Sequence, residues 1–158
     1  QGMQPIAGYN FGARLYQRVT KVLKITIGYA TAVTTFGFLV GMLMPDLVVG
    51  IFTSDEELIA LSARGLRITV MFFPIIGFQM VAANFFQSIG MAGKAIFLSL
   101  SRQLLILLPL LLILPTFYGV DGVWYSMPAS DFLASLIAAV MLWWQFRQFK
   151  KGAPIKQI

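Results

Sequence analysis

The chain has 158 residues, of which 58% are hydrophobic and 11% are charged. Soluble domains average roughly 45–50% apolar and about 25% charged residues, so this composition excludes a water-soluble globule and predicts a membrane protein. We attribute the net charge of +6 to basic cytoplasmic loops rather than to a nucleic-acid partner. The sequence has no Cys and no His, which excludes disulfides, Cys or His metal sites and Cys or His nucleophiles.

The first 24 residues (1–24) predict the end of a preceding transmembrane helix followed by a basic cytoplasmic turn or helix. Gln1 is not an initiator methionine and no secretory signal follows it, so we expect a piece of a longer protein. Arg14, Arg18 and Lys21 share one face of the segment 13–24, opposite an apolar face. An interfacial helix on anionic lipid and a cytoplasmic extension of the next span fit this pattern equally well.

Uncharged runs predict four transmembrane helices and therefore an all-α integral membrane fold. The expected segments are 25–52, 55–90 with an extension outside the membrane, 101–118, 124–149, and a basic cytoplasmic tail at 150–158. Ser54 and Glu57 have the spacing of a capping box at the start of the second helix. Pro115 predicts the end of the third helix. In the fourth segment a helix from about Pro128 to Phe149 is long enough to span, and Asp131 is expected in its first turn, near the headgroups.

The distribution of charge predicts the orientation of these spans. Ten of the twelve basic residues lie on one predicted side: Arg14, Arg18, Lys21, Lys24, Lys94, Arg102, Arg147, Lys150, Lys151 and Lys156. All six acidic residues, with Arg64 and Arg67, lie on the other side. Because Lys and Arg are retained on the cytoplasmic side, we expect both ends of the chain to be cytoplasmic, in a bacterial inner membrane.

The first span carries a stripe of small residues spaced by three or four, namely Thr26, Ala30, Thr34, Gly37 and Gly41. Such a stripe lets another helix approach closely. Static helix packing is the favoured interpretation, and a sliding surface between moving helices is the alternative.

The second span contains the candidate substrate pathway, formed by Gln79, Met80, Asn84 and Gln87. Three amides in one span are expected to face protein or a wet cavity rather than lipid. They would hydrogen-bond a solute, or they would join helices as polar contacts worth about 0.6 kcal/mol each, and we favour the second only slightly. Pro74 is a candidate hinge in this span, and Pro109 is a candidate kink in the third.

The predicted spans hold no carboxylate near their middle, where an acid normally marks an ion or proton site. The sequence therefore predicts no catalytic residue, no metal site and no coupling carboxylate in this segment. It argues against an acid–base enzyme, an intramembrane protease and the small four-helix multidrug exporters that depend on a membrane-embedded Glu.

Three stretches carry a resemblance to a known family. They are QPIAGYNFGAR (Gln4 to Arg14), FFPIIGFQMVAANFFQSIGMAGKA (Phe72 to Ala95) and SRQLLILLPLLLILPTFYGVDGVWYSMPASD (Ser101 to Asp131). In this order they resemble the multidrug and toxic-compound extrusion (MATE) family, from the end of helix eight through helix twelve. The resemblance covers nearly the whole chain.

The resemblance implies a twelve-helix transporter of two six-helix lobes, of which this chain forms most of the C-terminal lobe. Such proteins export mostly cationic, amphipathic drugs by alternating access, driven by inward Na⁺ or H⁺. The implied partners are membrane lipid, small-molecule drugs and the N-terminal lobe, with no nucleic acid and no cofactor beyond the coupling ion. Some members carry an acidic residue in helix ten, where this chain has Gly77 or Phe78, so the ion site is expected in the N-terminal lobe.

Two alternatives remain open. A lipid-linked saccharide flippase of the same superfamily would line its cavity with cationic residues, and the predicted spans hold no Lys or Arg near their middle. A stand-alone membrane scaffold or subunit is the other alternative, and the missing initiator methionine counts against it.

Overall fold

The computed structural model describes residues 2–150, and these residues form helices and short turns without a strand. The elements are α1 (Met3–Gly12), α2 (Tyr16–Leu43), α3 (Pro45–Gly50), α4 (Glu56–Val70), α5 (Phe73–Ser88), α6 (Ala92–Leu100), the π-helix η1 (Ser101–Leu107), α7 (Leu108–Tyr118) and α8 (Val120–Lys150). The predicted tail 150–158 lies outside the described residues, apart from Lys150.

Three helices in this part of the chain are long and apolar enough to cross a membrane: Tyr16–Leu43, Ala92–Tyr118 and Val120–Lys150. The pair α4 and α5 also qualifies as one span, broken by a bend of 51°. With the bent pair counted as one span, the structure contains the four spans that the sequence predicts.

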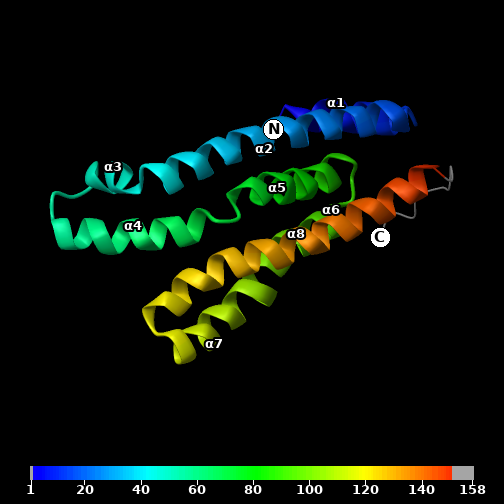
Figure 1. The fold of residues 1–158 in the computed structure, drawn as a ribbon. Coiled ribbons are helices and arrows are strands. Elements are labelled where there is room, and N and C mark those ends of the chain that lie inside the picture. The colour runs from blue at the N-terminus through cyan, green and yellow to red at the C-terminus, as the bar shows by residue number, and fades with distance from the viewer. Residues whose placement is uncertain (1, 151–158) are drawn as a thin grey trace.

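Helix α5 lies at the centre of the bundle. It packs against α1 and α2 on one side and against α6 and α8 on the other. In Figure 1, α2 runs alongside the bent pair α4–α5, while α8 lies with α6 and α7 on the opposite side. The most deeply buried large side chains near α5 are Phe85, Phe86, Leu23 and Leu98. Large apolar side chains that point outward, such as Tyr29, Val33 and Phe36 on α2, suit contact with lipid.

The small residues of α2 pack against the bent pair. A Cβ added to Gly41 would lie 3.1 Å from both methyl groups of Val70, and one added to Gly37 would lie 3.7 Å from Phe73. Packing accounts for these positions of the stripe, because small residues let two helix backbones approach closely.

Local details differ from the sequence prediction at the helix ends. Asp55, not Ser54, caps α4: its Oδ1 accepts hydrogen bonds from the backbone N–H groups of Glu57 (3.0 Å) and Leu58 (3.2 Å). Pro115 lies inside α7, which continues to Tyr118 and ends at Gly119 with φ of +57°. Glycine adopts this left-handed conformation without the steric penalty of a Cβ, so Gly119 ends the helix.

Three of the helices start earlier than expected, among them α8, which starts at Val120 rather than at 124. Residues 16–24 belong to the same continuous helix as the first span, which favours a helix extension over a separate interfacial helix. The third span starts at Ala92 rather than at 101. Its middle section is π-helical, and the N–H of Leu108 donates to the carbonyl of Gln103, five residues back. Pro109 is the next residue, and because it has no N–H it cannot donate an α-helical hydrogen bond.

Candidate functional site

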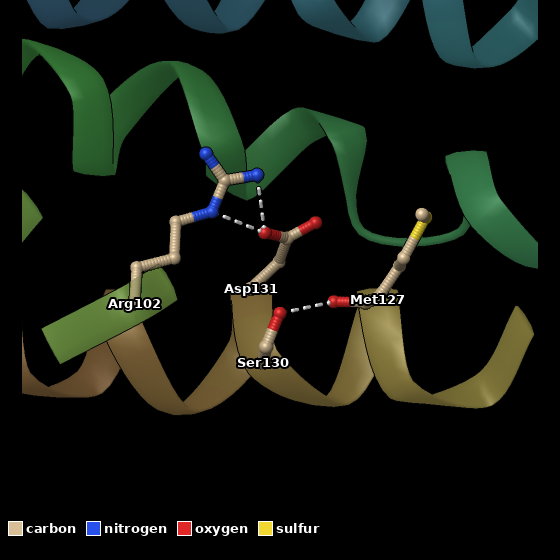
Figure 2. Close-up of polar contacts among 4 residues, drawn as sticks. All are labelled: Arg102, Met127, Ser130 and Asp131. Carbon is tan, nitrogen blue, oxygen red and sulfur yellow. Dashed lines mark hydrogen bonds and ion pairs between the residues drawn. The ribbon is translucent and has the colours of Figure 1, made fainter. Parts of the chain in front are cut away.

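An ion pair lies inside the bundle between η1 and α8. Both Nε and Nη2 of Arg102 lie 2.7 Å from Oδ1 of Asp131 (Figure 2). The Asp131 side chain is only 5% exposed, whereas the Arg102 side chain is 35% exposed. Beside them, the Ser130 hydroxyl donates to the carbonyl of Met127 at 2.8 Å, so it does not compete for Asp131. Two charge-assisted contacts to one oxygen make this the strongest polar interaction between these two helices.

The ion pair corrects two predictions. Asp131 was expected in the first turn of its helix, near the headgroups, but α8 starts at Val120 and places Asp131 about 16 Å along its axis. Arg102 was expected in a cytoplasmic loop, but it lies within the continuous helix Ala92–Tyr118. Each of the two residues is ten or more residues from either end of its helix. The chain therefore does hold a carboxylate and an arginine within helices that are long and apolar enough to cross a membrane.

The bend between α4 and α5 lies next to this pair. Phe72, in the break, and Phe132, which follows Asp131, have ring centroids 5.5 Å apart. Pro74 is the second residue of α5, at a position where its missing N–H leaves no helical bond unmade. Ser135, one helical turn after Asp131, is buried, and its Oγ has no hydrogen-bond partner among the described residues. Polar groups thus gather where one span is broken.

A groove of about 350 Å³ lies between α5 and α6, and we name it the polar groove. It is lined by Ala83, Asn84, Gln87, Ala92, Ala95, Ile96, Ser99 and Leu100. Its volume is at the lower end of the roughly 300–1,000 Å³ typical of small-molecule sites. Asn84 and Gln87 supply amide groups on one wall, and the other wall is mostly apolar. Such a surface can hydrogen-bond one end of an amphipathic solute and cover its apolar body.

The structure separates the four predicted pathway residues into two groups. Asn84 and Gln87 line the polar groove together. Gln87 also accepts a long hydrogen bond, 3.5 Å, from the amide of Gln4 in α1. Gln79 is 4% exposed and buried within the bundle, and Met80 is 53% exposed, and neither lines this groove. The role of all four residues in substrate contact stays a prediction. The roles of Pro74 as a hinge and of Pro109 as a kink stay predictions as well.

Two further polar contacts flank the ion pair along α8. Arg64 of α4 pairs with Asp121 at 2.6 Å near the start of α8. Toward the other end, Lys94 Nζ donates to Oε1 of Gln145 at 2.9 Å and lies 5.4 Å from the ring centroid of Phe86. Gln145 is buried, and its Nε2 has no partner among the described residues. Three basic side chains from three elements therefore contact α8 at three levels.

Sequence reasoning missed the Arg102–Asp131 site because it took each charged residue as the boundary of a span. The useful signal was the stretch AIFLSL before Ser101, which is too apolar for a cytoplasmic loop and extends the third helix toward its start. Placing Arg102 inside a helix would have required a buried acidic partner, and Asp131, which precedes the uncharged stretch 132–146, was a candidate.

Comparison with known proteins agrees with this architecture. The MatE family model matches residues 1–113. The multidrug export protein MepA of Staphylococcus aureus (strain MSSA476) is 25% identical over 146 residues, which cover 90% of this chain and 31% of that protein. The chain thus spans about a third of the length of the curated relatives it matches.

Solved structures give the same fold. An inward-facing multidrug resistance MATE family transporter of the MOP superfamily superposes with a TM-score of 0.86 at 20% identity, over 96% of this chain and 36% of that one. A mutant of the Vibrio cholerae MATE transporter VcmN gives a TM-score of 0.84 at 19% identity, over 92% of this chain and 33% of that one.

Proposed function

The chain belongs to the MatE family, and from this we propose that it acts as part of a cation-coupled multidrug efflux antiporter. In this proposal it supplies most of the C-terminal lobe, and the N-terminal lobe of the same transporter is its main partner. The exported compounds are amphipathic and mostly cationic, and inward movement of Na⁺ or H⁺ drives their export by alternating access. The protein would be a transporter rather than an enzyme.

The observation that carries the proposal is the polar groove beside a charged pair, within a chain of this family. Asn84 and Gln87 offer amide oxygens to the N–H groups of a cationic solute, while Ala95, Ile96 and Leu100 cover apolar surface. The bend of 51° between α4 and α5 and the π-helix η1 are irregular segments of the kind that moving transporter helices use.

The test uses the full-length transporter that contains this chain, reconstituted in proteoliposomes. We expect ethidium, a fluorescent cation, to move against its gradient when a proton or sodium gradient is imposed in the opposite direction. Dissipating that gradient with an ionophore should stop the movement. Uphill transport of anionic dyes instead, or no transport under either gradient, would contradict the proposal.

The flippase alternative has one observation in its favour, because Arg102 is a cation inside a span. Its charge is neutralised by Asp131 at 2.7 Å, however, which leaves it less available to an anionic headgroup. The same proteoliposomes, loaded with a fluorescent lipid-linked saccharide, distinguish the two functions. Translocation of that lipid without ethidium transport would favour the flippase.

A further inference from the structure

We propose that Asp131 is a proton-binding site in which a proton replaces Arg102, and that the released Arg102 then repels a cationic solute from the polar groove. This inference rests on the proposed antiport function and names the residues through which this lobe would couple proton binding to drug release. The ion pair, the exposure of its two members and the position of the groove carry it.

The two partners differ in their access to polar surroundings. Asp131 is 5% exposed and fixed on the continuous helix α8, whereas Arg102 is 35% exposed and has a long, flexible side chain. A buried charge that loses its partner is strongly destabilised. Arg102 can therefore move away only if Asp131 is neutralised, and within this environment a proton is the simplest ligand that does so.

Arg102 is the charged group that faces Asp131 among the described residues. Helix α5, which packs beside it, has no titratable side chain in its sequence. The remaining charged or titratable side chains of α8 and of the elements packed on it are Glu56, Glu57, Arg64 and Arg67 of α4, Lys94 of α6, Tyr118 of α7, and Asp121, Tyr125, Arg147 and Lys150 of α8. Asp121 is about 15 Å from Asp131 along the helix axis and Gln145, the partner of Lys94, about 21 Å.

Arg102 is close to the polar groove along its own helix. Arg102 follows Ser99 by three residues, and residues three apart are neighbours on a helix surface. Ser99 lines the groove, so Arg102 lies one turn beyond its wall. The positive charge of an unpaired Arg102 at this position would repel a cation bound in the polar groove. When Arg102 is paired with Asp131, the two side chains together carry almost no net charge.

The helix that carries Arg102 is built to allow such a movement. Arg102 is the second residue of η1, and π-helices are uncommon segments that often occur at functional sites. The far end of this span is held tightly, because a Cβ on Gly122 of α8 would lie 2.5 Å from the Leu114 carbonyl. A change in the hydrogen-bonding pattern of η1 would therefore turn α6 and Arg102 rather than α7.

The exchange balances in charge and atoms. The carboxylate of Asp131 gains one proton from water and becomes neutral, and Arg102 keeps its proton and its positive charge. The site gains one positive charge, and a departing monovalent cation removes one. Proton binding and cationic drug binding therefore weaken each other, as antiport requires.

The test measures ethidium binding to the purified full-length transporter by fluorescence, at mildly alkaline and mildly acidic pH. We expect affinity to fall by roughly tenfold to twentyfold on acidification, the effect of one charge roughly 10 Å away at an effective dielectric constant of about 20. Asp131→Asn mimics the protonated state, so it should bind weakly at both pH values. The double variant Arg102→Gln with Asp131→Asn removes both charges, and it should regain high affinity at both pH values.

Each result bears on the proposal. The matched control, Arg64→Gln with Asp121→Asn, removes the exposed ion pair near the start of α8 and should keep the wild-type pH dependence. Because Asp131→Asn leaves an unpaired arginine and could misfold, the double variant provides the decisive measurement. If the double variant binds ethidium with unchanged pH dependence, the inference is wrong. If the wild-type transporter neither binds nor exports ethidium, the proposed efflux function itself is wrong, and the inference about Asp131 falls with it.

Discussion

Gly77 of α5 lies directly against the backbone of Ala30 in α2. A Cβ atom on Gly77 would lie 2.9 Å from both the carbonyl carbon and the carbonyl oxygen of Ala30, and 2.9 Å from Oγ1 of Thr34. Real Cβ atoms essentially never come this close to backbone. The contact fixes the distance between α2 and α5. It therefore also fixes the position of Asn84 and Gln87, which α5 carries.

We therefore expect Gly77→Ala to destabilise the protein by about 1–3 kcal/mol, because one added methyl group forces two packed backbones apart. The measurement is the thermal unfolding of the full-length transporter in detergent. Gly28 of α2 is the matched control, since a Cβ there meets nothing within 4 Å. Equal melting temperatures for Gly77→Ala and Gly28→Ala would mean that the two helices are not in close contact.

The cap of α4 gives a second prediction. Asp55 accepts hydrogen bonds from Glu57 and Leu58, whereas Ser54 makes no such contact. Asp55→Ala should destabilise the first turn of α4 by about 0.5–2 kcal/mol, because two backbone N–H groups lose their acceptor. Amide hydrogen exchange of Glu57 and Leu58 should accelerate accordingly. Ser54→Ala is the control and should leave both rates unchanged. Faster exchange in the Ser54 variant and not in the Asp55 variant would show that Ser54 caps α4, as the sequence predicted.

The charge distribution predicts the topology. A reporter fused after Ile158 should behave as cytoplasmic, and reporters inserted at Asp55 and Asp121 should behave as exported, because basic residues are retained inside. Alkaline phosphatase, which is active only when exported, and a fluorescent protein that folds only inside provide opposite readouts. A cytoplasmic signal at Asp55 would eliminate the four-span arrangement, since it would place both ends of the second span on the same side.

The spans could be predicted because they depend on a local property. Roughly 20 consecutive apolar residues are needed to cross the bilayer, and such runs are visible without any tertiary information. Pro74 pointed to the region where α4 and α5 meet, but its role as a hinge stays a prediction, because it stands at the start of α5, where no helical hydrogen bond is lost. The small residues of α2 predicted that another helix approaches closely, but they named neither α5 nor Gly77 as the partner.

The site itself could not be read in the same way. Arg102 and Asp131 are 29 residues apart, and each by itself looks like the end of a span. Only their pairing makes both tolerable inside the membrane, and pairing is a property of the folded bundle. The same holds for the amides: helical periodicity placed Gln79 and Gln87 on one face, but the neighbouring helices bury the first and leave the second in a groove.

The last prediction separates these amides by their surroundings. Asn84→Ala and Gln87→Ala should change the relative export of different cationic drugs, because each removes a hydrogen bond worth about 0.5–1.5 kcal/mol only from solutes that use it. Gln79 is buried, so Gln79→Ala should lower protein level and weaken all drugs in proportion. Resistance to several unrelated cationic drugs, normalised to the amount of transporter in the membrane, measures both effects. A uniform loss in the Asn84 and Gln87 variants would assign those amides to helix packing, and a drug-selective change in the Gln79 variant would place that residue in the substrate pathway.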